Sequence, residues 1–175
     1  MLSLVIYREK EAWCGLDKTI IERISFEIAQ INKLISVYAD ILDRRDKEAP
    51  GLVEITALGG VLHSFYTGLE NIFLNIAKRI DKQIPTGAEW HHDLLNQMTQ
   101  AELYRNPVLS EALAERIDQY LGFRHLFRHA YTFIMRWDEM EKLVTTLPEI
   151  WKQVQEQLVV FLDGLQENDD LAAKK

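Results

Sequence analysis

The chain carries two long runs of hydrophobic residues whose members recur at steps of three and four. The first run is Ile21, Ile24, Ile28, Ile31, Ile35, Tyr38 and Leu42, and the second is Ile55, Leu58, Leu62, Phe65, Leu69, Ile72, Ile76 and Ile80. This spacing places the members of each run on one face of an α-helix. Pro50 and Gly51 separate the two runs, because proline and glycine both destabilise the interior of a helix. The pattern therefore predicts a long helix ending near residues 44–48 and a second helix over about 55–80.

The next part of the chain is interrupted at two points. The stretches "QIPTGAEW" (83–90) and "RNP" (105–107) contain proline, so we expect a shorter helix over about 90–101 between them. Hydrophobic residues resume at Val108 and lead into the stretch "FRHLFRHAY" (123–131). Placed at about 100° per residue, this stretch forms one amphipathic helix that continues to Trp137. We expect one arc of this helix to be buried: Phe123, Leu126, Phe127, Ala130, Phe133, Ile134 and Trp137.

A last run of hydrophobic residues predicts a separate closing helix. Pro148 suits its first turn, and Asp138 and Thr146 are suitable N-caps for the last two helical segments. The run consists of Leu147, Trp151, Val154, Leu158, Phe161 and Leu165.

No segment alternates in the way that a half-buried strand requires. The 175 residues are 47% hydrophobic and include only 8 Gly and 4 Pro, which favours one sizeable core and few linkers. We therefore predict a single all-α domain over residues 1–166, an up-and-down bundle of four to five helices. Residues 167–175 contain few hydrophobic residues and are expected to form a disordered tail.

Charge and cysteine content restrict the function. The formal net charge of −7 argues against a protein that coats nucleic acid with its whole surface, but it allows a local basic site. Cys14 is the single cysteine, so no internal disulfide can form. No hydrophobic run approaches the roughly 20 residues of a membrane span, and no signal peptide is recognisable. We expect a cytoplasmic protein.

The stretch "FRHLFRHAY" reverses this charge locally. Between Leu121 and Trp137 the chain has three arginines and two histidines and no Asp or Glu. A solvated helix face is one interpretation, although such faces more often mix charges. A metal site is another, because His125 and His129 are four residues apart and His91-His92 could add a ligand. The neighbouring arginines would repel a cation, so we expect neither metal nor cofactor.

The same arginines suit an anion. A guanidinium stays charged and can donate two parallel hydrogen bonds to phosphate oxygens, so Arg124 and Arg128 are candidates for phosphate contacts. Positions 124 and 129 lie about 140° apart around a helix, so the two side chains diverge unless a second copy of the chain contributes.

The spacing Arg124-x4-His129-Ala-Tyr131 resembles the R-x4-H-x-Y signature of HepT toxins, members of the HEPN superfamily of all-helical ribonucleases. His125 fills the place after the arginine where the superfamily often has a polar or imidazole side chain. The resemblance implies a HEPN-like fold and metal-independent RNA cleavage that yields a 2′,3′-cyclic phosphate. His129 would remove the proton of the ribose 2′-OH, and Arg124 would stabilise charge on the phosphate.

The resemblance also implies partners. HEPN nucleases place two such helices across a homodimer, and HepT toxins of type VII-like toxin–antitoxin pairs are silenced by a minimal nucleotidyltransferase antitoxin (MntA). That enzyme transfers AMP to the tyrosine of the motif, here Tyr131, and the added phosphates would occupy Arg124 and Arg128. Tyr131 is otherwise an ordinary packing residue at the edge of a helix face.

Residues outside the motif offer support. Glu70 follows His63 and Tyr66 on one side of the second helix and could orient Arg124 or His129 through a charge-assisted hydrogen bond. As the plainer interpretation, these are boundary residues of a bundle. Two function classes follow: a toxin-type endoribonuclease, or a non-catalytic partner that binds nucleotide or docks onto a nucleotidyltransferase.

Overall fold

The structure is a computed structural model of the chain. It describes the backbone of residues 2–44, 50–103, 105–129, 131 and 134–173, and the side chains of residues 19–43, 50–103, 105–129, 131 and 134–165. The helices are α1 (Leu2–Val37), α2 (Ala39–Arg44), α3 (Leu52–Ile76), the π-helical turn η1 (Ala77–Asp81), α4 (Trp90–Thr99), α5 (Glu111–His129) and α6 (Trp137–Ala173). No strand occurs in the described part of the chain, apart from one isolated bridge between Glu102 and Arg105. The predicted all-α bundle is confirmed.

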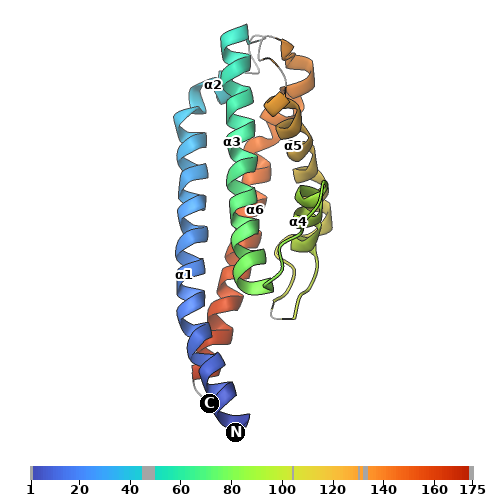
Figure 1. Cartoon of the computed structure of the whole chain (residues 1–175). Coiled ribbons are helices and arrows are strands. Elements are labelled where there is room, and N and C mark those ends of the chain that lie inside the picture. Colours follow the sequence, from blue (N-terminus) through green and yellow to red (C-terminus); the bar gives the residue numbers. More distant parts are fainter. Residues whose placement is uncertain (1, 45–49, 104, 130, 132–133, 174–175) are drawn as a thin grey trace.

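Helix α3 is the centre of the bundle (Figure 1). It packs against α1 on one side and against α4 and α5 on the other, and α6 crosses behind it. The predicted hydrophobic stripe of α3 forms the core, and six of its members are at most 1% exposed: Leu58, Leu62, Phe65, Leu69, Ile72 and Ile76. Each neighbouring helix covers part of α3, so α3 fixes the relative position of all the others.

Two predicted helix boundaries are wrong. Helix α1 begins at Leu2 rather than near Ile21, and α5 ends at His129 instead of continuing to Trp137. Leu126 and Ile134, which the helical pattern placed in a buried arc, are 49% and 57% exposed. Ala130 and Phe133 of that arc lie outside the described residues.

Helix α6 is also continuous where two segments were expected. Pro148 lies inside α6, and Thr146 is a helical residue whose hydroxyl donates to the Lys142 carbonyl, so it is no N-cap. A proline in a helix interior costs about 3 kcal/mol. Hydrophobic residues remain buried on both sides of it, including Val144, Leu147, Ile150 and Val154, and this burial offsets the cost. Helix α6 extends to Ala173, and the disordered tail expected at 167–175 stays a prediction.

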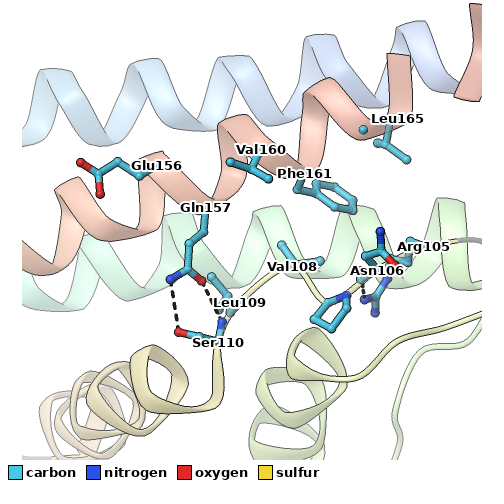
Figure 2. A pocket seen from close by; sticks show the side chains of 12 residues that line it. Arg105, Asn106, Val108, Leu109, Ser110, Glu156, Gln157, Val160, Phe161 and Leu165 are labelled. Atoms are coloured by element: carbon cyan, nitrogen blue, oxygen red, sulfur yellow. Dashed lines mark hydrogen bonds between the residues drawn. The ribbon is translucent and has the colours of Figure 1, made fainter. Parts of the chain in front are cut away.

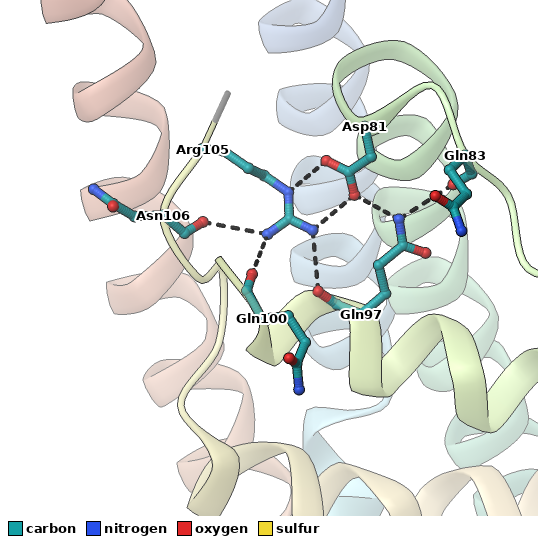
Figure 3. A network of polar contacts seen from close by, with 6 residues as sticks. All are labelled: Asp81, Gln83, Gln97, Gln100, Arg105 and Asn106. Atoms are coloured by element: carbon teal, nitrogen blue, oxygen red, sulfur yellow. Dashed lines mark hydrogen bonds and ion pairs between the residues drawn. The ribbon is translucent and has the colours of Figure 1, made fainter. Parts of the chain in front are cut away.

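A buried ion pair anchors the segment that carries α4 (Figure 3). Arg105 donates from Nε to Asp81 Oδ1 at 2.6 Å and from Nη2 to Asp81 Oδ2 at 2.7 Å. Its Nη1 and Nη2 groups also donate to the backbone carbonyls of Gln97, Gln100 and Asn106. Asp81 ends the π-helical turn after α3, so these bonds tie the end of α4 to the end of α3.

Candidate functional site

A buried carboxylate on α3 joins α4 and α5. Glu70 is 4% exposed and forms an ion pair with Arg124 of α5, with 2.7 Å between Oε2 and Nη2. Its other oxygen, Oε1, contacts Nδ1 of His91 in the first turn of α4. The pairing of Glu70 with Arg124 matches one of the two contacts that the sequence suggested. The contact with His91 was not anticipated, because the sequence suggested for His91 the role of a metal ligand.

The guanidinium of Arg124 is held inside the bundle. Arg124 is 8% exposed and lies over the Tyr66 ring, with 5.8 Å between Cζ and the ring centroid. Its Nε and Nη1 atoms are buried without a hydrogen-bond partner among the described residues. Burial, with a smaller contribution from the Glu70 carboxylate, raises the pKa of the Tyr66 hydroxyl. Arg124 therefore keeps donors that a further acceptor would satisfy.

Imidazoles surround this ion pair. The His125 ring meets His91 edge-on at 5.1 Å and stacks near His92 at 6.4 Å between centroids. His92 Nδ1 lies 2.8 Å from Asp118 Oδ1. Burial lowers the pKa of His125, and the charges of His91 and Arg124 lower it further. Among the described residues, no group of three or more His, Cys, Asp or Glu side chains is arranged to hold a metal ion.

A further imidazole, His63, packs between α3 and α5. His63 of α3 stacks on Phe127 of α5, with 5.3 Å between centroids and 24° between ring planes. Burial lowers the pKa of His63, and the charges of Arg124 and Arg128 lower it further. His63 therefore favours its neutral form beside two arginines.

The remaining predicted residues lie on the surface at the end of α5. Arg128 and His129 are exposed in its last turn, and Tyr131, 73% exposed, follows beyond the helix end. The expectation that Tyr131 lies on the same helix is wrong. The structure thus pairs Glu70 and Arg124 inside the bundle, places the partly buried His125 beside His91 and His92, and leaves Arg128, His129 and Tyr131 on the surface. Arg124 and His129 diverge, as their spacing of about 140° requires.

A cavity of about 390 Å³ lies elsewhere, between the segment 105–110 and α6 (Figure 2). Its walls are largely hydrophobic, and Gln157 and Ser110 form hydrogen bonds with each other at one side. None of the predicted site residues lines it, so the candidate site is the cluster between α3, α4 and α5 together with the end of α5.

Comparison with protein families agrees with the motif. Residues 57–165, which include Glu70, both ends of the motif and most of the bundle core, match the family model described as HepT-like protein. The chain belongs to the HepT-like family. This family is part of the HEPN superfamily, whose members are generally ribonucleases, and it places the HepT-like chain in a toxin–antitoxin context.

No curated protein and no solved structure matches this HepT-like chain significantly. In the described residues, no helix is both long enough and hydrophobic enough to cross a membrane.

Proposed function

We propose that this HepT-like protein is the toxin of a type VII-like pair, a cytoplasmic endoribonuclease that cleaves RNA without a metal ion. His129 removes the proton of a ribose 2′-OH, and the oxygen attacks the adjacent phosphorus. The 5′-oxygen of the next nucleotide leaves and takes up a proton, returned by His129 or supplied by water, giving a 2′,3′-cyclic phosphate and a 5′-hydroxyl. The observation that carries this proposal is the exposed His129 imidazole beside exposed Arg128, in a HepT-like chain.

Arg124 has the second role in this proposal, the stabilisation of negative charge on the phosphate. Its Nε and Nη1 groups, buried without a partner among the described residues, are the donors that a phosphate oxygen would meet. His125 and Arg128 add positive or polar character around it, and Glu70 orients its guanidinium through the 2.7 Å contact. A low-dielectric surrounding strengthens such charge stabilisation.

The divergence of Arg124 and His129 within one chain supports a homodimer with composite sites. In such a dimer, His129 of one protomer acts on a phosphate that meets Arg124 of the other. Mixing Arg124→Ala chains with His129→Ala chains then restores one intact site per mixed dimer. Recovery of cleavage on mixing two inactive variants supports the composite site, and no recovery in a verified mixed dimer refutes it.

Tyr131 is proposed as the acceptor of AMP from a cognate minimal nucleotidyltransferase. Its position just beyond α5, 73% exposed, suits access by a second enzyme. The added phosphates would compete with RNA for Arg128 and the end of α5. Mass spectrometry of the protein incubated with that enzyme and ATP should show additions of AMP that disappear in Tyr131→Phe.

Cleavage tests the enzyme directly. The purified protein is incubated with transfer RNA and messenger RNA in EDTA, beside His129→Ala and Arg124→Ala. We expect cleavage by the parent only, with cyclic phosphate at the new 3′ ends. Mass spectrometry first establishes that Tyr131 is unmodified. An unmodified parent that leaves both RNAs intact contradicts the nuclease proposal.

A second candidate is a non-catalytic partner that binds nucleotide or docks onto a nucleotidyltransferase. The burial of Arg124 against Glu70 favours it, since the guanidinium is engaged inside the protomer. Under this alternative the parent and the variants are equally inactive on RNA, while the nucleotidyltransferase still forms a complex with the chain.

A further inference from the structure

The bundle holds two buried pairs of an arginine and a carboxylate, and the two pairs differ in geometry. Arg105 meets Asp81 with two parallel hydrogen bonds, from Nε to Oδ1 at 2.6 Å and from Nη2 to Oδ2 at 2.7 Å (Figure 3). Arg124 meets Glu70 through a single contact, between Nη2 and Oε2 at 2.7 Å. A guanidinium and a carboxylate frequently form two parallel bonds, so the single contact of Arg124 requires a cause.

The two arginines also differ in their unpaired donors. All three nitrogens of the Arg105 guanidinium donate, because Nη1 meets the carbonyls of Gln100 and Asn106. In contrast, Nε and Nη1 of Arg124 are buried without a hydrogen-bond partner among the described residues. A second bond to Glu70 would satisfy one of them, and a buried unpaired donor costs free energy. A further contact must therefore hold the carboxylate away from the two-bond geometry.

His91 makes that contact. Its Nδ1 meets Oε1 of Glu70, which is the oxygen that a second bond from Arg124 would need. A carboxylate only accepts hydrogen bonds, so Nδ1 is the donor. The His91 side chain is 9% exposed, and the Trp90 ring lies 3.6 Å from it between centroids, which restricts its movement. Each oxygen of Glu70 is thus committed to a different helix.

We propose that His91 is a positioning residue of the RNA-cleaving site, which keeps the pair of Glu70 and Arg124 to a single bond. Nε and Nη1 of Arg124 then stay available for a phosphate oxygen. This inference rests on the proposed ribonuclease function, in which Arg124 stabilises charge on the phosphate. Without the Nδ1 donor, Oε1 of Glu70 turns to Arg124 and occupies one of those donors, as Asp81 does in Arg105.

The proposal gives α4 a role in the chemistry of the site. His91 lies in the first turn of α4, whereas Arg124 belongs to α5. The bonds of Arg105 to Asp81 and to the Gln97 carbonyl tie the end of α4 to the end of α3. The donors of Arg124 are therefore available only while α4 is docked in this position.

Two substitutions of similar size separate hydrogen bonding from packing. In His91→Asn the side-chain amide takes the place of Nδ1 and can still donate to Glu70, whereas His91→Leu has no donor. The matched control is His92→Leu, which removes the neighbouring imidazole. That imidazole is 46% exposed and contacts Asp118 instead of Glu70. Urea unfolding first establishes that each variant is folded.

The guanidinium N–H signals of Arg124 in a nitrogen–proton NMR spectrum report the pair without any RNA. Loss of these signals in Arg124→Lys identifies them. In His91→Leu we expect one Nε or Nη1 proton signal to move downfield and to exchange more slowly with water, because a new hydrogen bond forms. The signals should stay at the parent positions in His91→Asn and His92→Leu.

Cleavage of RNA gives the functional measurement. An interaction made only in the transition state lowers kcat and kcat/KM together. His91→Leu should therefore lower kcat about tenfold to hundredfold and leave KM within about twofold of the parent. His91→Asn should restore kcat to within about threefold of the parent, and His92→Leu should keep it there.

Parent-like Arg124 signals in a folded His91→Leu protein overturn the proposal, and so does undiminished cleavage by that variant. A His91→Asn protein that behaves like His91→Leu also overturns it, because the imidazole then acts through its shape. If His91→Leu does not fold, His91→Gln replaces it, since its amide lies at the place of Nε2 rather than Nδ1. A parent that cleaves no RNA refutes the nuclease, and the NMR comparison still decides whether His91 sets the geometry of the pair.

Discussion

The buried pair of Asp81 and Arg105 offers a sharp test of what holds α4 in place. The substitution Asp81→Asn removes the negative charge and preserves the shape of the side chain. The side chains of Arg105 and Asp81 are 0% and 1% exposed, so the guanidinium that remains has no access to water. The carbonyls of Gln97, Gln100 and Asn106 still accept its hydrogen bonds but supply no compensating charge.

The magnitude follows from the burial. Breaking a buried ion pair by removing one partner costs about 3–5 kcal/mol, whereas a surface pair contributes about 0–1 kcal/mol. Stabilities of single domains are about 5–15 kcal/mol, so Asp81→Asn removes a large share. For a chain of this length, about 2–4 °C per kcal/mol predicts a melting temperature lower by roughly 6–20 °C.

Urea and thermal unfolding followed by circular dichroism measure this difference. The matched control is Glu149→Gln, which makes the same chemical change in the exposed pair with Arg116, where the two side chains are 60% and 35% exposed. We expect Glu149→Gln to stay within about 1 kcal/mol of the parent. If Asp81→Asn is no more destabilising than Glu149→Gln, the pair does not anchor the α4 segment.

Three further results are expected. Gly59→Ala should destabilise the protein by about 1–3 kcal/mol in urea unfolding, because the added Cβ would lie 2.8 Å from the Phe127 ring. The neighbouring Gly60→Ala, whose added Cβ would have nothing within 4 Å, should stabilise the protein by up to about 1 kcal/mol. Tyr120→Phe should cost about 0.5–1.5 kcal/mol in the same assay, since the buried hydroxyl donates to the Leu143 carbonyl at 2.9 Å. Burial raises the pKa of the Tyr120 hydroxyl to about 12, so absorbance at 295 nm should show no ionisation of Tyr120 at pH 10. Folding lowers the pKa of His63 below 6.5, so its contribution is present above pH 6.5 and is lost as the pH falls; His63→Gln should weaken the fall in stability between pH 7 and 5.

The core of the fold was predictable because α3 is buried along a regular stripe. A helix that packs on several sides must keep hydrophobic residues at steps of three and four, and the run from Leu58 to Ile76 does so. The helix ends were less predictable. Burial along α6 outweighs the intrinsic cost of Pro148. At the end of α5, no glycine or proline in the sequence signals that the helix stops at His129.

The candidate site was predictable in part. The pairing of Glu70 with Arg124 could be anticipated from residue types, since a buried guanidinium needs a carboxylate. The role of His91 could not be anticipated, because it depends on where the segment after α3 places α4. That position is fixed by the contact of Asp81 with Arg105, two residues 24 positions apart in the sequence. His63 gave a weak signal, as it precedes Glu70 by two turns on the same side of α3.

The arrangement of the motif decides which substitutions are informative about chemistry. Glu70, Arg124 and His91 join three helices inside the bundle, so removal of Glu70 leaves a buried charge and destabilises the fold whatever the protein does. Loss of cleavage in Glu70 or Arg124 variants therefore combines folding with catalysis. His129 is exposed in the last turn of α5, where a substitution by alanine has little to disrupt. A folded His129→Ala protein that no longer cleaves RNA would separate the chemistry from the stability of the bundle.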